Sequence, residues 1–286
     1  MNTSLTLQQA LLQAHHQGME RIDAQMLLLH VLGQANAGRA WLLTHDSDVL
    51  TPEQQSRFAT LCAQRLDGVP VAYLTGCKEF FGLPLHVDAR VLDPRPDTET
   101  LVEWALDVLE KTVSPRILDL GTGSGAIALA LQSQRPDASV TAVDFSQDAL
   151  DVAAANAQRL QLPVHLVQSS WLERVGGVFD AIVSNPPYIR EADEHMPALR
   201  HEPRHALTSG EDGLQDIRTI IAQAPAHLKA GGWLLLEHGW DQAADVQSLL
   251  RTAGFTQVHS RQDLAGMDRC TGGQIPESAA AANTVK

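Results

Sequence analysis

From about Ser114 onward, short apolar runs alternate with stretches that have helical spacing. The runs that read as buried strands are RILDLG, SVTAVD, VHLVQS, FDAIVSN and GGWLLLEHG. The stretches between them include AIALALQSQ and QDALDVAAANAQRL, in which apolar residues recur every three or four positions. This alternation predicts an α/β fold with a mostly parallel, doubly wound sheet, whose ligands bind beyond the carboxyl ends of the strands.

The first seventy residues differ, because their pattern is helical throughout. Leu, Ile and Met recur at three- and four-residue spacings in LTLQQALLQAHH and RIDAQMLLLHVLG. A further helix is expected to begin after Thr51, with Pro52 at its first position and Gln54 placed for a capping box. These features predict a small helical bundle.

The segment that joins the two patterns has its own composition. In EFFGLPLHV, apolar residues lie on both sides of Gly82 and Pro84, which predicts a short β-hairpin connector. We therefore expect four parts. They are a helical domain over residues 1–75, a hairpin linker over 76–96, a sheet domain over 97–274 and a disordered tail over 275–286.

The charge and the cysteine content limit the class of protein. A formal net charge of −13 argues against a surface that grips nucleic-acid backbone, which needs clustered Lys and Arg. Three cysteines without CxxC spacing indicate neither a disulfide framework nor a zinc site. No basic leader with an apolar run and no membrane-length apolar stretch is present. We expect a cytoplasmic monomer with no membrane partner and no direct nucleic-acid partner.

A glycine-rich turn, LDLGTGSGAIALAL, joins the first expected sheet strand to the next helix. Its glycines allow a ligand to approach the backbone closely, and the helix N-terminus offers free N–H groups. A phosphate-binding P-loop needs Lys after the last glycine, where Ala126 stands instead. The GxGxG spacing, Asp119 before it and Asp144 at the end of the second strand together favour S-adenosylmethionine. The loop alone leaves NAD as a serious rival.

The sequence NPPY, from Asn185 to Tyr188, directly follows the apolar run FDAIVS. The side-chain oxygen of Asn185 and the carbonyl of Pro186 can accept both hydrogens of one planar –NH2 group, and prolines bring no competing N–H. Tyr188 adds a face for a flat conjugated group. Because this motif ends a strand at the edge where the glycine loop holds its ligand, the pattern predicts methylation of an sp2 amino nitrogen.

These motifs together resemble the PrmC/HemK family, the glutamine-N5 methyltransferases that modify peptide chain release factors. The similarity rests on RPDTE (Arg95–Glu99), DLGTGSG (Asp119–Gly125), Asp144, NPPY, HEPRHAL (His201–Leu207) and GGWLLLEHGW (Gly231–Trp240). It implies a Rossmann-like S-adenosylmethionine-dependent methyltransferase of EC class 2.1.1 that acts in translation termination. It also implies that the substrate is the glutamine of the GGQ motif. Because a glutamine side chain alone offers too little to distinguish one protein from others, we expect the N-terminal helical domain to recognise the release factor.

The resemblance also implies roles for individual residues. The residues expected to hold S-adenosylmethionine are Gly121, Thr122, Gly123, Ser124, Gly125, Asp144, Trp171 and Asn185. Those expected to hold the substrate glutamine are Asn185, Pro186, Pro187 and Tyr188, of which Asn185, Pro186 and Tyr188 are the catalytic candidates. The roles of Arg95, Glu99 and Glu202 do not follow from the sequence.

The chain departs from the family pattern at two places. Ser170 stands before Trp171, where the family usually has Asp, and the C-terminal segment keeps Arg269 but lacks the usual final Gly-Arg. The same segment contains Gly272, Gly273 and Gln274, the tripeptide that is methylated in the substrate. A pseudosubstrate or self-methylation role is conceivable, but a chance occurrence is the default explanation.

Three other interpretations remain. A nucleic-acid adenine-N6 methyltransferase would share NPPY but needs an extruded base and a basic channel. A non-catalytic binding module on a methyltransferase fold would keep the loop without turnover. The i, i+4 pair His201 and His205 encloses Pro203 and has no evident third ligand, so no metal site is expected.

Overall fold

The computed structural model describes residues 4–277. The chain forms two compact units, which are described separately. The first runs to Cys77 and also includes Pro197–His201, whereas the second comprises Lys78–Met196 and the chain from Glu202 on.

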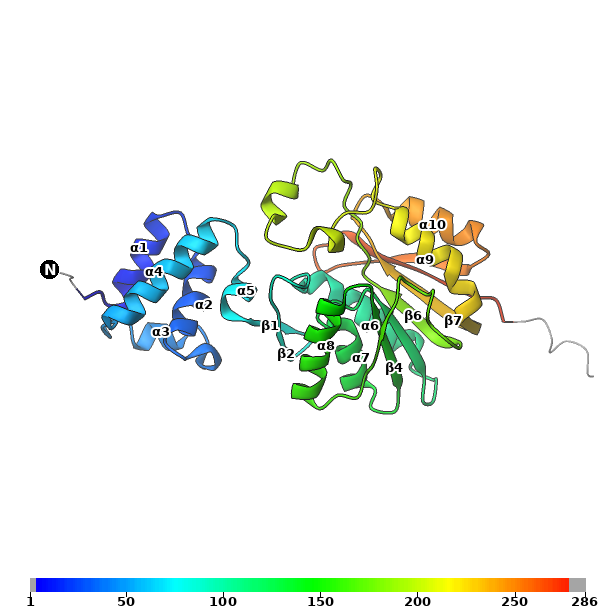
Figure 1. The fold of residues 1–286 in the computed structure, drawn as a ribbon, viewed down its shortest axis with the longest axis horizontal. Coiled ribbons are helices and arrows are strands. Elements are labelled where there is room, and N and C mark those ends of the chain that lie inside the picture. The colour runs from blue at the N-terminus through cyan, green and yellow to red at the C-terminus, as the bar shows by residue number, and fades with distance from the viewer. Residues whose placement is uncertain (1–3, 278–286) are drawn as a thin grey trace, which may run out of the picture. The chain divides into compact units, whose positions relative to one another are not determined.

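The first unit is helical (Figure 1). Its helices are α1 (Leu7–His16), α2 (Arg21–Val31), η1 (Ala35–Ala37), α3 (Trp41–Thr44), α4 (Pro52–Leu66) and α5 (Val71–Thr75). The capping box predicted at the start of α4 is confirmed, because the Thr51 side chain and the Gln54 side chain each accept a hydrogen bond from the other residue's backbone N–H. The first unit has its own hydrophobic core, which is formed by buried side chains of α1, α2 and α4, among them Leu7, Leu28 and Phe58.

The segment Pro197–His201 is separated in sequence from the rest of the first unit. Arg200 makes an ion pair of 2.6 Å with Asp67, and His201 Nε2 lies 3.2 Å from the other oxygen of that carboxylate. Nothing in the sequence pattern indicated this pairing. The chain therefore passes from the NPPY motif through the first unit before it re-enters the second at Glu202.

A seven-stranded sheet forms the centre of the second unit (Figure 1). Its strands are β3 (Arg116–Leu120), β4 (Ser139–Asp144), β5 (His165–Gln168), β6 (Phe179–Ser184), β7 (Leu228–Glu237), β8 (Thr256–Gln262) and β9 (Asp268–Gln274). The order is β5-β4-β3-β6-β7-β9-β8, and the pairs from β5 to β7 are parallel whereas β9 runs antiparallel to both β7 and β8. The predicted doubly wound, mostly parallel α/β fold is confirmed.

Helices cover both faces of this sheet (Figure 1). They are α6 (Glu99–Val108), α7 (Ala126–Gln134), α8 (Gln147–Leu160), α9 (Gln215–Gln223) and α10 (Ala243–Thr252). The second unit also contains the short 3-10 turns η2 (Pro96–Thr98), η4 (Arg204–Ala206) and η5 (Ala224–His227), whereas η3 (Met196–Leu199) lies almost wholly in the segment assigned to the first unit. Apolar residues of α9 and α10 share one buried cluster with Leu118 and Leu234. No helix in the described range is long and apolar enough to cross a membrane.

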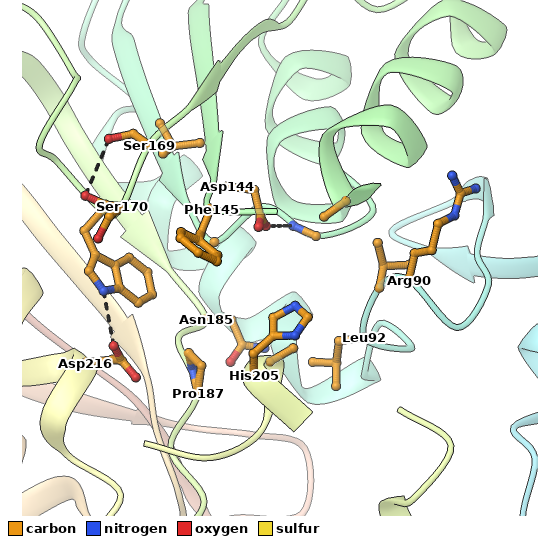
Figure 2. Close-up of a pocket in the computed structure, with 17 residues that line it drawn as sticks. Arg90, Leu92, Asp144, Phe145, Ser169, Ser170, Asn185, Pro187, His205 and Asp216 are labelled. Atoms are coloured by element: carbon orange, nitrogen blue, oxygen red, sulfur yellow. Dashed lines mark hydrogen bonds between the residues drawn. The ribbon is translucent and has the colours of Figure 1, made fainter. Parts of the chain in front are cut away.

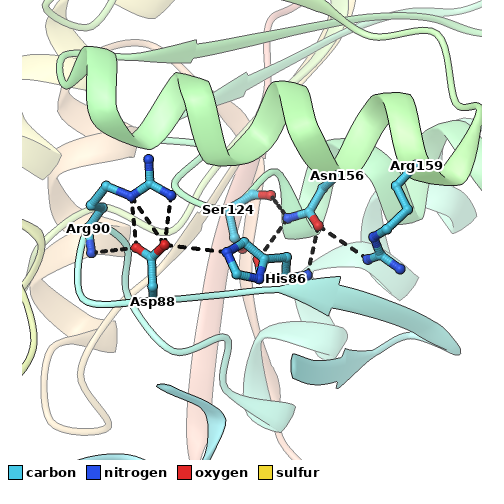
Figure 3. Close-up of polar contacts among 6 residues, drawn as sticks. All are labelled: His86, Asp88, Arg90, Ser124, Asn156 and Arg159. Carbon is cyan, nitrogen blue, oxygen red and sulfur yellow. Dashed lines mark hydrogen bonds and ion pairs between the residues drawn. The ribbon is translucent and has the colours of Figure 1, made fainter. Parts of the chain in front are cut away.

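The predicted hairpin consists of β1 (Cys77–Phe80) and β2 (Leu83–His86), with both turn residues, Phe81 and Gly82, at positive φ. The buried amide of Asn156 on α8 holds it (Figure 3). The Asn156 side chain accepts from the backbone N–H of His86 at 2.7 Å and donates to the carbonyls of His86 and Ser124 at 2.9 Å. One side chain thus connects the hairpin to the glycine loop.

The Gly272-Gly273-Gln274 tripeptide lies inside β9, paired with both β7 and β8. A Cβ atom at Gly272 would lie 2.5 Å from Leu235 and 3.0 Å from Trp104, so close packing explains the glycine. The Gln274 amide donates to the Gly231 carbonyl at 2.8 Å. The tripeptide is therefore a structural part of the sheet, and its amide is engaged there. The following Ile275 also packs against the core, while 278–286 of the predicted tail lie outside the described residues.

Gly272→Ala should destabilise the protein by about 1–3 kcal/mol, because the added methyl group overpacks a site with no free volume. Gly176→Ala is the matched control, since a Cβ there meets nothing within 4 Å. Chemical denaturation measures the difference. Equal stability of the two variants would show that β9 accommodates a side chain at this position.

Candidate active site

The register of the parallel strands brings three sequence motifs to one edge of the sheet. Leu120, the last residue of β3, pairs with Val143 of β4 and with Ser184 of β6. The Ser184 hydroxyl also donates to the Leu120 carbonyl at 2.7 Å. Leu120, Val143 and Ser184 therefore lie level, and the residues that come next along the chain, which are the glycine loop, Asp144 and Asn185, occupy neighbouring positions.

An open pocket of about 270 Å³ lies at this edge (Figure 2). Its lining residues are Arg90, Val91, Leu92, Gly121, Gly123, Val143, Asp144, Phe145, Ala149, Ser169, Ser170, Trp171, Asn185, Pro187, His205, Ala206 and Asp216. The predicted site residues that it brings together are Gly121, Gly123, Asp144, Trp171, Asn185 and Pro187. Residues of the expected donor site and of the expected acceptor site thus share one pocket.

The remaining loop residues lie behind the pocket and support it. The Thr122 hydroxyl donates to the buried carboxyl of Asp119 at 2.6 Å, and the Ala128 N–H donates to the same oxygen at 3.2 Å. Burial raises the pKa of Asp119 to about 7, against these two hydrogen bonds. Gly125 has φ of +85°, and a Cβ there would lie 3.0 Å from Leu129 of α7 and 3.3 Å from Ala153 of α8, so this glycine allows the loop to turn into α7 close to α8. Thr122 and Gly125 therefore shape the loop and are absent from the pocket lining.

Asp144 faces the pocket (Figure 2) and keeps acceptor capacity there. Its two oxygens accept from the backbone N–H groups of Gly123 and Ser146, each at 2.9 Å. A carboxylate offers about four lone-pair sites, so two backbone bonds leave room for further donors. Burial raises the pKa of Asp144, and the two backbone donors oppose that rise. The side chain is held in place and can still accept hydroxyl groups of a ligand.

Trp171 adopts φ of +47°, a left-handed conformation that is rare for a bulky residue. Its indole Nε1 donates to Asp216 at 3.2 Å, and its ring lies near the position that a Cβ on Gly121 would take. Ser170 also lines the pocket. The strained backbone holds the indole at the pocket wall, which is a placement expected of a ligand-binding residue.

The NPPY residues divide between the pocket and the core. Asn185 and Pro187 line the pocket, whereas the Tyr188 ring packs against the buried cluster of the second unit. The Asn185 amide Nδ2 donates to Thr98 Oγ1 at 3.2 Å, and the Tyr188 hydroxyl donates to Glu237 Oε1 at 3.2 Å. Burial raises the pKa of Tyr188, so it remains a neutral hydrogen-bond donor.

The chain is similar to known proteins over most of its length. The PrmC N-terminal domain matches residues 5–76, and the methyltransferase small domain matches residues 98–261. The release factor glutamine methyltransferase of Bordetella pertussis is 49% identical over 262 residues, covering 90% of this chain and 96% of the relative. That of Xylella fastidiosa strain Temecula1 is 50% identical over 272 residues, covering 93% and 98%. The chain belongs to the release factor glutamine methyltransferase family.

Among solved structures, the catalytic domain of hMettl16 in complex with MAT2A 3′UTR hairpin 1 matches with a TM-score of 0.58. It is 15% identical, and the match covers 81% of this chain and 85% of that one. At this identity the likeness concerns the fold alone. The family resemblance inferred from the motifs is confirmed.

The structure shows what Arg95, Glu99 and Glu202 contact, three residues whose roles could not be inferred from the sequence. Arg95 pairs with the buried Glu202 at 2.5 Å, and the other Glu202 oxygen accepts from the Asp93 N–H at 3.3 Å. Glu99 accepts from the Phe81 N–H at 3.0 Å. Arg95 and Glu202 join the segment before α6 to the loop after NPPY, while Glu99 fixes the hairpin turn.

Several residues that line the pocket were not predicted from the sequence. Phe145 lines it with 73% of its surface exposed, and His205 and Asp216 reach it from the loop after β6 and from α9. Phe145 had a local signal, because an aromatic residue directly follows the strand-ending Asp144. Asp216 had none, and His205 was visible only as part of HEPRHAL, since only tertiary folding places these two residues beside Trp171 and Asn185. In the described range, no group of His, Cys, Asp and Glu suits a metal ion.

Asp144→Ala should weaken S-adenosylmethionine binding by about 1.5–3 kcal/mol, the range for hydrogen bonds to a charged group. The control is Asp148→Ala, which removes the same charge from the exposed first turn of α8, outside the pocket. Calorimetry measures both affinities, and thermal unfolding verifies that both variants fold. An unchanged affinity for the Asp144 variant would contradict its assignment to the donor site.

Proposed function

We propose that this chain transfers the methyl group of S-adenosylmethionine to the side-chain amide nitrogen, N5, of the glutamine in the GGQ motif of peptide chain release factors. The observation that carries the proposal is the shared pocket, since Asn185 of NPPY lines the same space as Gly121, Gly123 and Asp144. Membership in the family and its high identity to the named relatives support the choice of substrate.

The donor would occupy the half of the pocket formed by the glycine loop. Gly121 and Gly123 allow its close approach to the backbone, and Asp144 would accept from the ribose hydroxyls. Phe145 and Trp171 offer aromatic faces for the adenine ring. Ser170 supplies a hydroxyl where the family usually has a carboxylate, so the aromatic contacts would carry more of the adenine affinity.

The acceptor glutamine would lie beside NPPY. The Asn185 side-chain oxygen and the Pro186 carbonyl would accept the two amide hydrogens, with the Tyr188 ring behind the planar amide. Among the described residues no hydrogen-bond donor occupies Asn185 Oδ1, and Asn185 Nδ2 is already used by Thr98. This leaves the acceptor atom available to the substrate.

Positioning supplies much of the rate enhancement, because an amide nitrogen is delocalised and a weak nucleophile. Holding it in line with the sulfonium methyl can contribute up to about 7–11 kcal/mol. The N–CH3 bond forms as the S–CH3 bond breaks, and S-adenosylhomocysteine leaves. The hydrogen bonds to Asn185 and Pro186 strengthen as the nitrogen becomes positive, so they stabilise the transition state more than the ground state. The released proton passes to water.

Recognition of the release factor would come from the first unit, because a glutamine side chain alone cannot distinguish one protein from others. That unit contains a groove of about 410 Å³ whose lining is mainly apolar, with Leu11, Leu12, Leu42 and Leu43 among its residues. Leu43 is 68% exposed and Leu12 50%, so the groove offers a partner apolar side chains from two places in the unit. The net charge of −13 favours a protein substrate over nucleic acid, and we propose a cytoplasmic monomer.

Asn185→Ala should lower kcat by about 10²- to 10³-fold, because it removes transition-state stabilisation and leaves a substrate N–H unpaired. The assay follows labelled methyl transfer from S-adenosylmethionine to an intact release factor. Donor affinity should change little. A release factor with its GGQ glutamine substituted, and duplex DNA, are the control substrates. Label on DNA and none on the factor would favour the adenine-N6 alternative, and full turnover by the variant would exclude the NPPY assignment.

Substituting the groove leucines, as Leu12→Glu with Leu43→Glu in the full chain, should lower kcat/KM for intact release factor by about tenfold or more. Turnover of a short GGQ peptide and donor affinity should be unchanged, since the pocket is untouched. Val113→Glu is the control, because Val113 is 87% exposed and lies in the second unit. Equal loss with the control, or no loss with the groove variant, would place recognition elsewhere.

A further inference from the structure

The middle of the NPPY motif has no backbone hydrogen-bond donor. Pro186 and Pro187 lack the N–H group, so neither residue can anchor the motif by donating a hydrogen bond. Their rings fix φ but leave ψ to be set by the surroundings. The direction of the Pro186 carbonyl, a proposed acceptor for the substrate amide, therefore depends on how the chain is held before and after the two prolines.

The chain is held at both ends of the motif. Before the prolines, Ser184 ends β6, and its hydroxyl donates to the Leu120 carbonyl at 2.7 Å. After them, the side chain of Gln242, which directly precedes α10 and is 4% exposed, takes this part. Its Nε2 donates to the Tyr188 carbonyl at 3.1 Å and to the Asp212 carbonyl at 3.4 Å. A side chain from a distant part of the sequence thus anchors the downstream end of NPPY.

The amide of Gln242 is held in one orientation. Its Oε1 accepts from the Gly239 N–H at 2.8 Å, while its –NH2 group faces two carbonyl oxygens. Turning the amide over would place oxygen against oxygen at both carbonyls and –NH2 against N–H. Gln242 is also the N-cap residue of α10, yet its side chain makes no capping hydrogen bond. Its polar atoms therefore serve the neighbouring loops and not its own helix.

A glycine in the loop before α9 allows the loops to meet at this amide. Gly213 has φ of +76°, and a Cβ there would lie 2.2 Å from the Tyr188 carbonyl oxygen and 2.8 Å from Gln242 Nε2. Any side chain at this position would displace the Tyr188 carbonyl. Three segments, which are the end of NPPY, the loop before α9 and the loop before α10, therefore converge on a single buried amide.

Resting on the proposed function, we propose that Gln242 is a positioning residue for methyl transfer, because it sets the backbone direction of NPPY from its downstream end. Gln242 is absent from the lining of the pocket, so it acts through Tyr188 and not by touching the donor. A misplacement of the reacting groups by about 1 Å can cost about 10²-fold in rate. Loss of this anchor therefore acts on the transfer step and leaves donor binding intact.

The first variant removes the amide and keeps the size of the side chain. Methionine has nearly the length and volume of glutamine but cannot donate to the two carbonyls. Gln242→Met should lower the single-turnover rate of methyl transfer to an intact release factor, at saturating donor and substrate, by about tenfold or more. Affinity for S-adenosylhomocysteine, measured by calorimetry, should be unchanged because Gln242 does not line the pocket. Thermal unfolding verifies that the variant is folded at the assay temperature.

Gly213→Ala and Gly210→Ala form a matched pair in the loop before α9. Their φ angles are similar, +76° and +70°, so alanine brings similar backbone strain to both. At 213 the methyl group meets the Tyr188 carbonyl, whereas at 210 it meets the end of the Gln215 side chain. Gly213→Ala should lower the transfer rate as Gln242→Met does, and Gly210→Ala should retain it within about twofold. If the loop matters only for folding, the two glycine variants should lose equally.

The Tyr188 carbonyl can also be observed without turnover. The chain has two tyrosines, and only Tyr188 is followed by an isoleucine. Labelling tyrosine with ¹³C at the carbonyl and isoleucine with ¹⁵N therefore gives a single NMR correlation, from the peptide group that joins Tyr188 to Ile189. This signal should shift in Gln242→Met and in Gly213→Ala, which alter the hydrogen bond at that carbonyl. It should stay nearly in place in Gly210→Ala.

The outcomes separate the two proposals. Lower transfer rates in Gln242→Met and Gly213→Ala, with retention in Gly210→Ala, support the positioning role. An unchanged rate in folded Gln242→Met overturns it, and so does an equal loss in the two glycine variants. If Gly213→Ala does not fold, the rate and the spectrum of Gln242→Met decide. Absence of methyl transfer by the unaltered enzyme would instead count against the proposed function, and an unmoved Tyr188 signal in Gln242→Met would then still overturn the positioning role.

Discussion

The parallel pairing of β3 with β4 and β6 is the constraint on which the site depends. The N–H groups of Gly121 and Thr122 both donate to the Val143 carbonyl, so the start of the glycine loop, directly after β3, is anchored to the neighbouring strand β4. On the other side, the Ser184 hydroxyl holds the carbonyl of Leu120, and Asn185 follows at once. A shift of β3 by one residue would separate the glycine loop from the NPPY motif, although both would still be present in the chain.

Two buried acids support the two halves of the pocket. Asp119 holds the glycine loop through Thr122, and Glu237 holds the NPPY motif through Tyr188. Burial raises the pKa of each to about 7. Both carboxyl groups oppose folding through desolvation, and both give their neighbours a fixed hydrogen-bonding direction. Stability is thus exchanged for a defined geometry of the two motifs that line the pocket.

The sequence was most informative where a local rule applies. Strands β3 to β7 were visible as apolar runs, and the start of α4 as a capping box at Thr51. The last two strands, β8 and β9, were missed, because TQVHSRQ and DRCTGGQ are largely polar and carry two glycines. Their apolar contacts are supplied by other elements, such as Trp104 and Leu235 packed on Gly272. Strand pairing there overrides local propensity.

The sequence by itself determined the fold class, the family and the chemistry, since strand–helix alternation, the glycine loop and NPPY are each read from neighbouring residues. Only the tertiary structure decided which side chains meet. It placed Phe145 and Asp216 in the pocket, and it set Glu237 behind Tyr188 although the two are far apart in the chain. The physical reason is that hydrogen bonds and desolvation act between groups close in space. Local sequence patterns carry no information on which distant residues become such neighbours.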